Sequence, residues 1–230
     1  MTALVILPGL DGTGTQHAPF IDALGDVPGA VTVVRYPRDQ ALDYKGLEAL
    51  ARAALPVDVP FVLLGESFSG PIAISIAADP PPNMRGLVLS TTFARAPVPV
   101  LSPFAAWLPP VSARRVPMNL LSWLLLGRWA TPDVTAALRC ALSSVPSATL
   151  RHRAALTLAV DVSPLLQRIT LPVLYLRARG DRLIRPAAGR EITAAIRAAS
   201  LLQIEGPHLL LQACPQQSAQ AVAAFLAQQH

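Results

Sequence analysis

Six short apolar runs, each bounded by turn residues, recur along the chain and restrict the folds it can adopt. They lie at residues 3–7, 31–36, 60–65, 86–90, 171–178 and, more weakly, 200–206. Most are continuous runs of aliphatic residues, without the apolar–polar alternation of a strand that has one face in water. Strands that are apolar on both faces are typical of a parallel sheet covered by helices on each side.

The segments between these runs carry helical patterns. They span residues 17–25, 42–56, 69–79, 185–199 and 215–229. Strand and helix therefore alternate almost throughout, and right-handed crossovers then predict a doubly wound, mostly parallel α/β sheet of about six strands. In such sheets, ligands bind beyond the carboxyl ends of the strands.

One interval, residues 93–160, breaks the alternation because it shows no strand signal. It consists of apolar and basic helical pieces cut by prolines, and it holds all three tryptophans. We expect it to form an inserted helical cap on a single domain, residues 1–230, whose core comprises residues 1–92 and 161–230.

Composition limits the remaining choices. With 52% hydrophobic and 14% charged residues in 230, the chain can bury one large core. The N-terminus has no signal-peptide pattern and no apolar run is long enough for a membrane span, so we expect a cytoplasmic protein. Cys140 and Cys214 have no metal-ligand spacing to each other or to a histidine, and no cofactor or metal is predicted.

Polar residues follow several of the predicted strands. A glycine-rich loop, residues 8–14, follows the first strand, and Ser67 in GESFSG follows the third. Asp181 follows the fifth, and His208 follows the sixth. Serine, acid and histidine in this chain order match the order expected of an α/β-hydrolase.

The sequence resembles the α/β-hydrolase superfamily over most of its length. LPGLDGTG with GESFSG is similar to the esterase, thioesterase and acyltransferase branches. LPVLYLRARGDRLIRP resembles the strand, acid loop and helix of the family, and IEGPHLLLQACP resembles its histidine turn. The resemblance implies a core of six parallel strands and a glycine loop that supplies half of an oxyanion hole.

The chemistry gives each residue a role. A serine hydroxyl needs a base to remove its proton during attack, so Ser67 would be the nucleophile and His208 the base. Asp181 would orient the imidazole and stabilise its protonated form. The backbone N–H groups of Leu10 and Phe68 would bind the oxyanion.

Each assignment has a structural alternative. Ser67 could be a helix-capping serine, and the motif G-x-S-x-G is broken because Ser69 stands where glycine is expected. Asp181 could be a turn residue, while its rival Asp161 better fits a helix cap. His208 has three competitors as the base, namely His17, His152 and His230. His17, beside the glycine loop, is interpreted as a surface or supporting residue.

The predicted cap suggests the substrate and partners. Phe104, Trp107 and Trp123 are the candidates for lining an acyl pocket. Residues 93–153 hold seven arginines and one acidic residue, about +6, whereas the rest of the chain is near neutral. This basic segment is either a solvated face or a surface for an anionic partner such as a carrier protein, a CoA ester or a lipid surface. Nucleic-acid binding is not expected because no recognised module accompanies the charge.

The leading hypothesis is a serine carboxylic ester hydrolase that acts on a small ester or acyl substrate through an acyl-enzyme. The first alternative keeps the same residues and changes the substrate, to thioester or methyl-ester hydrolysis or acyl transfer on a carrier protein or CoA. The second alternative is a non-catalytic α/β-hydrolase fold that binds a ligand or a lipid surface.

Overall fold

The structure is a computed structural model that describes residues 1–27, 29–97 and 117–229. These residues form one six-stranded parallel sheet in the order β2-β1-β3-β4-β5-β6. The strands are β1 (Ala3–Leu7), β2 (Val31–Val33), β3 (Phe61–Glu66), β4 (Met84–Ser90), β5 (Val173–Ala178) and β6 (Ala199–Ile204). The predicted doubly wound α/β fold is confirmed.

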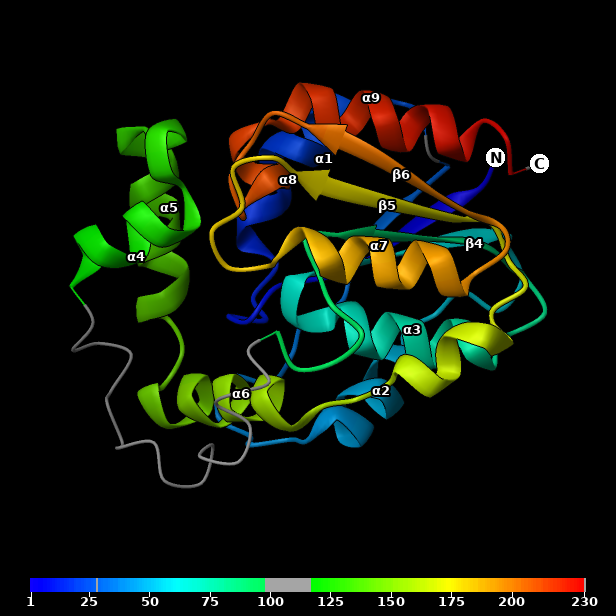
Figure 1. Cartoon of the computed structure of the whole chain (residues 1–230), viewed down its shortest axis with the longest axis horizontal. Helices are drawn as coiled ribbons and strands as arrows, with labels where there is room; N and C mark the ends of the chain where they lie inside the picture. The colour runs from blue at the N-terminus through cyan, green and yellow to red at the C-terminus, as the bar shows by residue number, and fades with distance from the viewer. Residues whose placement is uncertain (28, 98–116, 230) are drawn as a thin grey trace.

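Helices cover both faces of the sheet (Figure 1). One face carries α2 (Tyr44–Ala53), α3 (Gly70–Ala78) and α7 (Pro186–Ala195), and the other carries α1 (Ala18–Leu24), α8 (Leu210–Ala213) and α9 (Pro215–Leu226). Residues of β1 alternate between the two cores: Val5 and Leu7 pack on the α2 and α3 side, and Leu4 and Ile6 on the α1 and α9 side. All four are fully buried, which explains the continuous apolar runs.

The second strand is shorter than predicted. We expected residues 31–36, but β2 ends at Val33. The Tyr36 N–H donates to the carbonyl of Gly12, in the glycine loop, at 2.8 Å. The chain therefore leaves the sheet to brace this loop.

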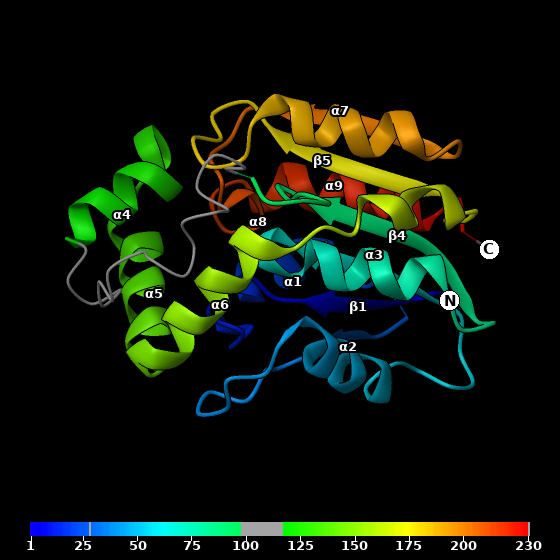
Figure 2. The same ribbon diagram turned by 60° about the horizontal axis from the view of Figure 1, so that its bottom comes forward.

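Three helices, α4 (Met118–Leu125), α5 (Pro132–Ser143) and α6 (Ser147–Ala159), lie between β4 and β5 in sequence. We call them the cap helices. They sit beyond the arrowheads of the parallel strands, whereas both chain ends lie at the opposite end of the sheet (Figures 1 and 2). The ends of the insertion meet in an antiparallel bridge between Arg95 and Asp161.

The sheet order reverses at β1, because β2 lies on one side of it and β3 on the other. The carboxyl ends of β1 and β3 are next to each other, with Leu7 paired to Gly65. In doubly wound sheets this switch point forms the ligand crevice. No helix in the ranges that the structure describes is long and apolar enough to cross a membrane.

The junction of β3 and α3 gives a test of the packing. A methyl group added to Gly70 would lie 1.8 Å from the Thr92 hydroxyl oxygen. We expect Gly70→Ala to lower the free energy of unfolding by about 1–3 kcal/mol, measured by urea denaturation.

Gly46→Ala in α2 is the matched control, because the nearest atoms to its added methyl group are 3.4 Å away. Alanine is the better helix former, so Gly46→Ala should be neutral or stabilising by up to about 1 kcal/mol. Equal losses in the two variants would contradict close packing at Gly70.

Candidate active site

Ser67 lies on a sharp turn between β3 and α3. Its φ is +47°, in the left-handed region that non-glycine residues rarely adopt. Small residues surround the turn, since a methyl group on Gly65 would lie 2.6 Å from the Ala73 methyl group. The turn places Ser67 at the carboxyl end of the sheet, in the crevice between β1 and β3.

The three residues predicted to act together are brought together by the structure. The Ser67 hydroxyl lies 2.8 Å from Nε2 of His208. Nδ1 of His208 lies 2.9 Å from one carboxylate oxygen of Asp181. Because Asp181 accepts this hydrogen bond, Nδ1 carries the proton and Nε2 is left to accept the hydroxyl proton of Ser67.

Asp181 is itself held in place by backbone groups. Its second carboxylate oxygen accepts from the N–H groups of Leu183 and Ile184 at 2.8 and 2.9 Å. The side chains of His208 and Asp181 are only 2% and 5% exposed. The imidazole therefore has a fixed orientation in a largely water-excluded setting, which general-base catalysis requires.

The backbone N–H of Phe68 is fixed through its own peptide group. The Thr92 hydroxyl donates to the Ser67 carbonyl, which belongs to the same peptide as the Phe68 N–H. A hydrogen bond to a carbonyl also polarises the N–H on the other side of the peptide. Tyr44 OH donates to the next carbonyl, that of Phe68, at 3.2 Å.

The glycine loop, residues 8–14, forms a tight turn beside Ser67. The Gly12 N–H donates to the Gly9 carbonyl at 3.0 Å, and Gly12 and Gly14 both have a φ of +69°. The Asp11 carboxylate accepts from the Thr13 N–H at 2.8 Å. The Gly9–Leu10 peptide, which carries the Leu10 N–H, is thereby held in one orientation.

A buried ion pair lies directly behind Ser67. Glu66 bonds to Nε2 of His17 and to the Gln212 side chain, both at 2.9 Å, and Glu66 and His17 are each 2% exposed. Burial alone would raise the pKa of Glu66, but the charge and hydrogen bond of His17 hold it below its ordinary value. Burial would lower the pKa of His17, but Glu66 raises it above its ordinary value.

A cavity of about 310 Å³ is lined by Ser67 and His208. Its polar end is formed by the glycine loop, Glu66 and Gln212. Its other walls are mostly leucines of the cap helices: Leu121, Leu124, Leu125, Leu138, Leu142, Leu150 and Leu158. An apolar cavity with a few convergent polar groups is typical of a small-molecule site.

Only some of the other predicted site residues line the cavity. Leu10 and Phe68 line the cavity next to Ser67. Trp123 does not line it: its side chain is 55% exposed, and the Arg182 guanidinium lies 4.7 Å from its ring centroid. Leu121, Leu124 and Leu125 occupy the inward face of α4 instead. Phe104 and Trp107 lie outside the described residues.

The rival residues lie away from the site. Asp161 caps the turn at Ser163, whose N–H it accepts at 2.9 Å. His152 bonds to the Leu42 carbonyl at 3.2 Å. Among the described residues, no group of three or more histidine, cysteine, aspartate and glutamate side chains could hold a metal ion.

Two supporting contacts were not predicted from the sequence. Arg153 of α6 is 1% exposed and donates to carbonyls of the glycine loop. The Ser69 hydroxyl donates to the Pro8 carbonyl and contacts Tyr36 OH at 2.7 Å. The serine that breaks the G-x-S-x-G pattern therefore ties the glycine loop to α3.

The fold and this arrangement of serine, histidine and aspartate define an α/β-hydrolase. The chain belongs to the Hydrolase_4 family, described as serine aminopeptidase, S33, whose family model matches residues 25–206. Membership of this family supports hydrolase activity.

The chain is 26% identical over 172 residues to a pyrrolizixenacetamide deacetylase of Xenorhabdus hominickii. The match covers 70% of this chain and 64% of that protein, less than two thirds of the relative's length. MenH from S. aureus superposes with a TM-score of 0.81 at 16% identity, covering 99% of this chain and 94% of that one. The esterase RhEst1 from Rhodococcus sp. ECU1013 gives 0.74 at 21% identity, covering 100% and 91%. The two structural likenesses show the fold.

The Glu66–His17 pair predicts a pH-dependent stability. The stabilisation from the raised pKa of His17 is complete below about pH 6.5 and is lost as pH rises through its folded-state value. The stabilisation from the lowered pKa of Glu66 is complete above about pH 4.5. It is lost as the pH falls through the pKa of Glu66 in the folded state. We expect His17→Gln to cost most unfolding free energy between these limits, measured by urea denaturation from pH 4 to 9.

His152→Gln is the control, because its ring bonds to a backbone carbonyl. A deficit in His17→Gln that stays constant over the whole pH range would contradict the ion pair.

Proposed function

We propose that the protein is a serine hydrolase that cleaves carboxylic esters through an acyl-enzyme intermediate. The proposal rests on one observation: Ser67, His208 and Asp181 form a continuous chain of hydrogen bonds at the polar end of an apolar cavity. Nucleophile, base and orienting acid within hydrogen-bond reach are the arrangement that activates a serine.

In the proposed first half-reaction, Ser67 Oγ attacks the ester carbonyl carbon while Nε2 of His208 takes its proton. The tetrahedral intermediate then collapses, and His208 returns the proton to the leaving alcohol. Water deacylates the enzyme by the same steps in reverse order, with His208 again acting first as base and then as acid. Asp181 stabilises the imidazolium in both halves.

The negative charge on the carbonyl oxygen is assigned to the N–H groups of Leu10 and Phe68. The contacts of Thr92 and of the Gly9–Gly12 turn support this, because they fix the two peptides before substrate binds. Preorganised donors of this kind typically contribute about 3–4 kcal/mol each to transition-state stabilisation.

The cavity walls support an acyl substrate that is apolar and uncharged. The leucines of the cap helices would bury an aliphatic chain, and no lysine or arginine lies among the described lining residues. The names of two similar proteins, a deacetylase and an esterase, are compatible with acyl hydrolysis.

Thioester hydrolysis and acyl transfer would use the same residues, and the basic segment was the reason to consider a carrier protein. Three of its arginines have internal partners: Arg95 pairs with Glu191 at 3.0 Å, Arg128 pairs with Glu205 at 3.4 Å, and Arg153 is buried. Arg114 and Arg115 lie outside the described residues. The leucine-lined cavity remains the reason to favour a small ester, and a carrier-protein partner remains a prediction.

Substitution of Ser67 and of Asp181 tests the reaction class. Ser67→Ala and Asp181→Asn should each lower kcat for p-nitrophenyl butyrate by about 10³-fold or more. The first removes the attacking oxygen, and the second no longer holds His208 in the tautomer that accepts the proton or stabilises its protonated form. Asp161→Asn, the rival acid, is the matched control and should retain wild-type turnover. Wild-type turnover in Ser67→Ala, or no labelling of the wild type by a fluorophosphonate, would contradict the proposal and favour a binding module.

The apolar walls of the cavity, which carry no lysine or arginine among the described lining residues, predict discrimination between acyl chains of equal length. Methyl hexanoate should be cleaved with a kcat/KM at least about 30-fold higher than monomethyl adipate, whose carboxylate would be buried without a cation. Monomethyl adipamate, of similar size but neutral, separates charge from polarity and should fall between the two. Equal kcat/KM values for the hexanoate and the adipate would contradict the assignment of the cavity to neutral chains.

A further inference from the structure

Arg153 is the largest fully buried side chain of the described residues, although it belongs to a cap helix and carries a charge. Its guanidinium donates to the carbonyls of Leu10 at 3.1 Å, Asp11 at 2.7 Å and Pro37 at 2.8 Å. Within the described ranges it forms no ion pair with a carboxylate. Burying a guanidinium is costly unless its donors find acceptors, and here three backbone carbonyls accept from Nη1 and Nη2.

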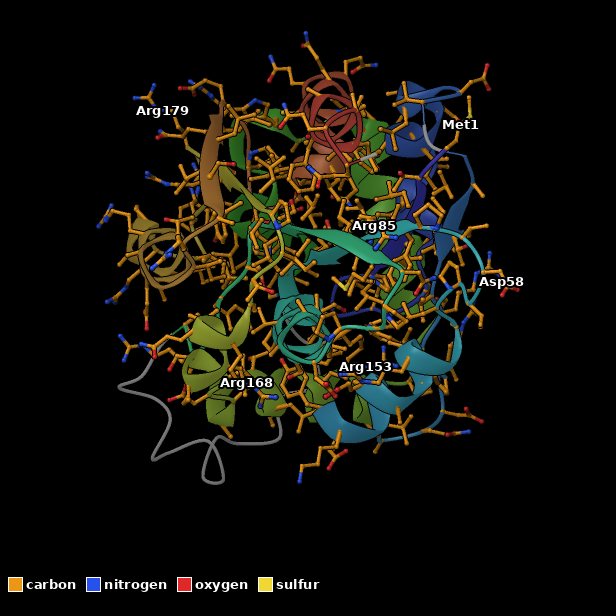
Figure 3. All side chains as sticks on the ribbon, turned by 90° about the vertical axis from the view of Figure 1, so that its right-hand side faces the viewer. Met1, Asp58, Arg85, Arg153, Arg168 and Arg179 are labelled. Carbon is orange, nitrogen blue, oxygen red and sulfur yellow. The ribbon has the colours of Figure 1, made fainter. Side chains whose placement is uncertain are left out.

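The Leu10 and Asp11 carbonyls belong to the same turn that carries the Leu10 N–H, and Pro37 directly follows Tyr36. The Arg153 guanidinium fits so closely that a methyl group on Gly12 would lie 2.5 Å from Nη1. In Figure 3 the labelled Arg153 lies within the outline of the molecule, in contrast to Arg179 at its periphery. A long cationic side chain from α6 therefore clamps the outer side of the glycine loop.

Tyr36 connects this clamp to the core. The Arg153 guanidinium lies 5.6 Å from the Tyr36 ring centroid, and the Tyr36 N–H holds the Gly12 carbonyl at 2.8 Å. Tyr36 OH contacts the Ser69 hydroxyl at 2.7 Å, and Ser69 in turn donates to the Pro8 carbonyl. The glycine loop is thus fixed at Pro8 from α3 and at Leu10 and Asp11 from the cap.

We propose that Arg153 is a positioning residue for catalysis, which holds the Leu10 N–H where the oxyanion forms and so couples the seating of α6 to transition-state stabilisation. The inference rests on the proposed function, because it needs Leu10 to be an oxyanion donor. A purely structural role would anchor the cap without favouring the transition state over the bound substrate. Removal of the guanidinium should lower kcat and boronate affinity selectively if Arg153 positions Leu10, and should weaken all ligands alike if Arg153 only anchors the cap.

The experiment compares Arg153→Met and Arg153→Lys with Arg151→Met, two residues earlier on the same helix. We would measure kcat and KM for p-nitrophenyl butyrate and the inhibition constants of two ligands. Butaneboronic acid forms a tetrahedral adduct with an active serine and needs the oxyanion donors. N-Methylbutyramide is planar and reports on the cavity alone.

For Arg153→Met we expect kcat to fall by about 10- to 100-fold, and the boronate to bind weaker by a similar factor, because one donor is misplaced. KM and the amide inhibition constant should change by less than about 3-fold. Arg153→Lys keeps the charge but lacks the planar fork that reaches several carbonyls, so it should recover only part of the loss. Arg151→Met should match the wild type.

Equal weakening of boronate and amide would overturn the proposal in favour of a structural anchor, and so would wild-type kcat and boronate affinity in the Arg153 variants. If Arg153→Met does not fold, Arg153→Lys decides alone: lower kcat and weaker boronate at an unchanged unfolding temperature support the proposal, and wild-type values overturn it. A wild type that neither cleaves esters nor reacts with a fluorophosphonate would instead refute the proposed function.

Discussion

The backbone of Ser67 adopts a left-handed conformation that L-residues rarely adopt, and its neighbours in the fold hold it there. A left-handed residue of this kind costs about 1–3 kcal/mol and persists only where the surroundings impose it. Here Gly65 and Gly70 allow β3 and α3 to approach, and Thr92, at the end of β4, closes on both Gly70 and the Ser67 carbonyl. The Ser67 hydroxyl and the Phe68 N–H thus take their positions from one strained turn.

Residues that follow strands could be located from the sequence, because parallel strands bring their carboxyl ends to one edge wherever they occur in the chain. Ser67, Asp181 and His208 were found in this way. Trp123 was misplaced because α4 carries large apolar residues on several sides, Leu120 and Trp123 as well as Leu121, Leu124 and Leu125, and only packing decides which side faces the cavity. Arg153 was missed because nothing local distinguishes an arginine that binds carbonyls from one that faces water.

The structure shows that several arginines of the segment between β4 and β5 have partners within the protein, which a count of charged residues does not reveal. Arg95 and Arg128 are each paired with a glutamate outside the segment, Glu191 and Glu205. The Arg153 guanidinium donates hydrogen bonds to backbone carbonyls. The Arg95 and Arg128 side chains are 61% and 72% exposed and still contribute to the surface field, whereas Arg153 is buried. Arg153 is therefore the part of this basicity that joins the cap to the core.

The antiparallel bridge between Arg95 and Asp161 gives the fold a modular boundary. The Val162 N–H donates to the Ala94 carbonyl at 2.8 Å, and the Ala96 N–H donates to the Val160 carbonyl at 2.9 Å. Because the two stems meet there, an insertion of another length could replace the cap at little cost in closure entropy, which grows slowly with loop length. Such exchanges would alter which molecules enter the cavity while the sheet stays unchanged. They would also remove the contacts of Arg153 with the glycine loop unless the new segment replaces them.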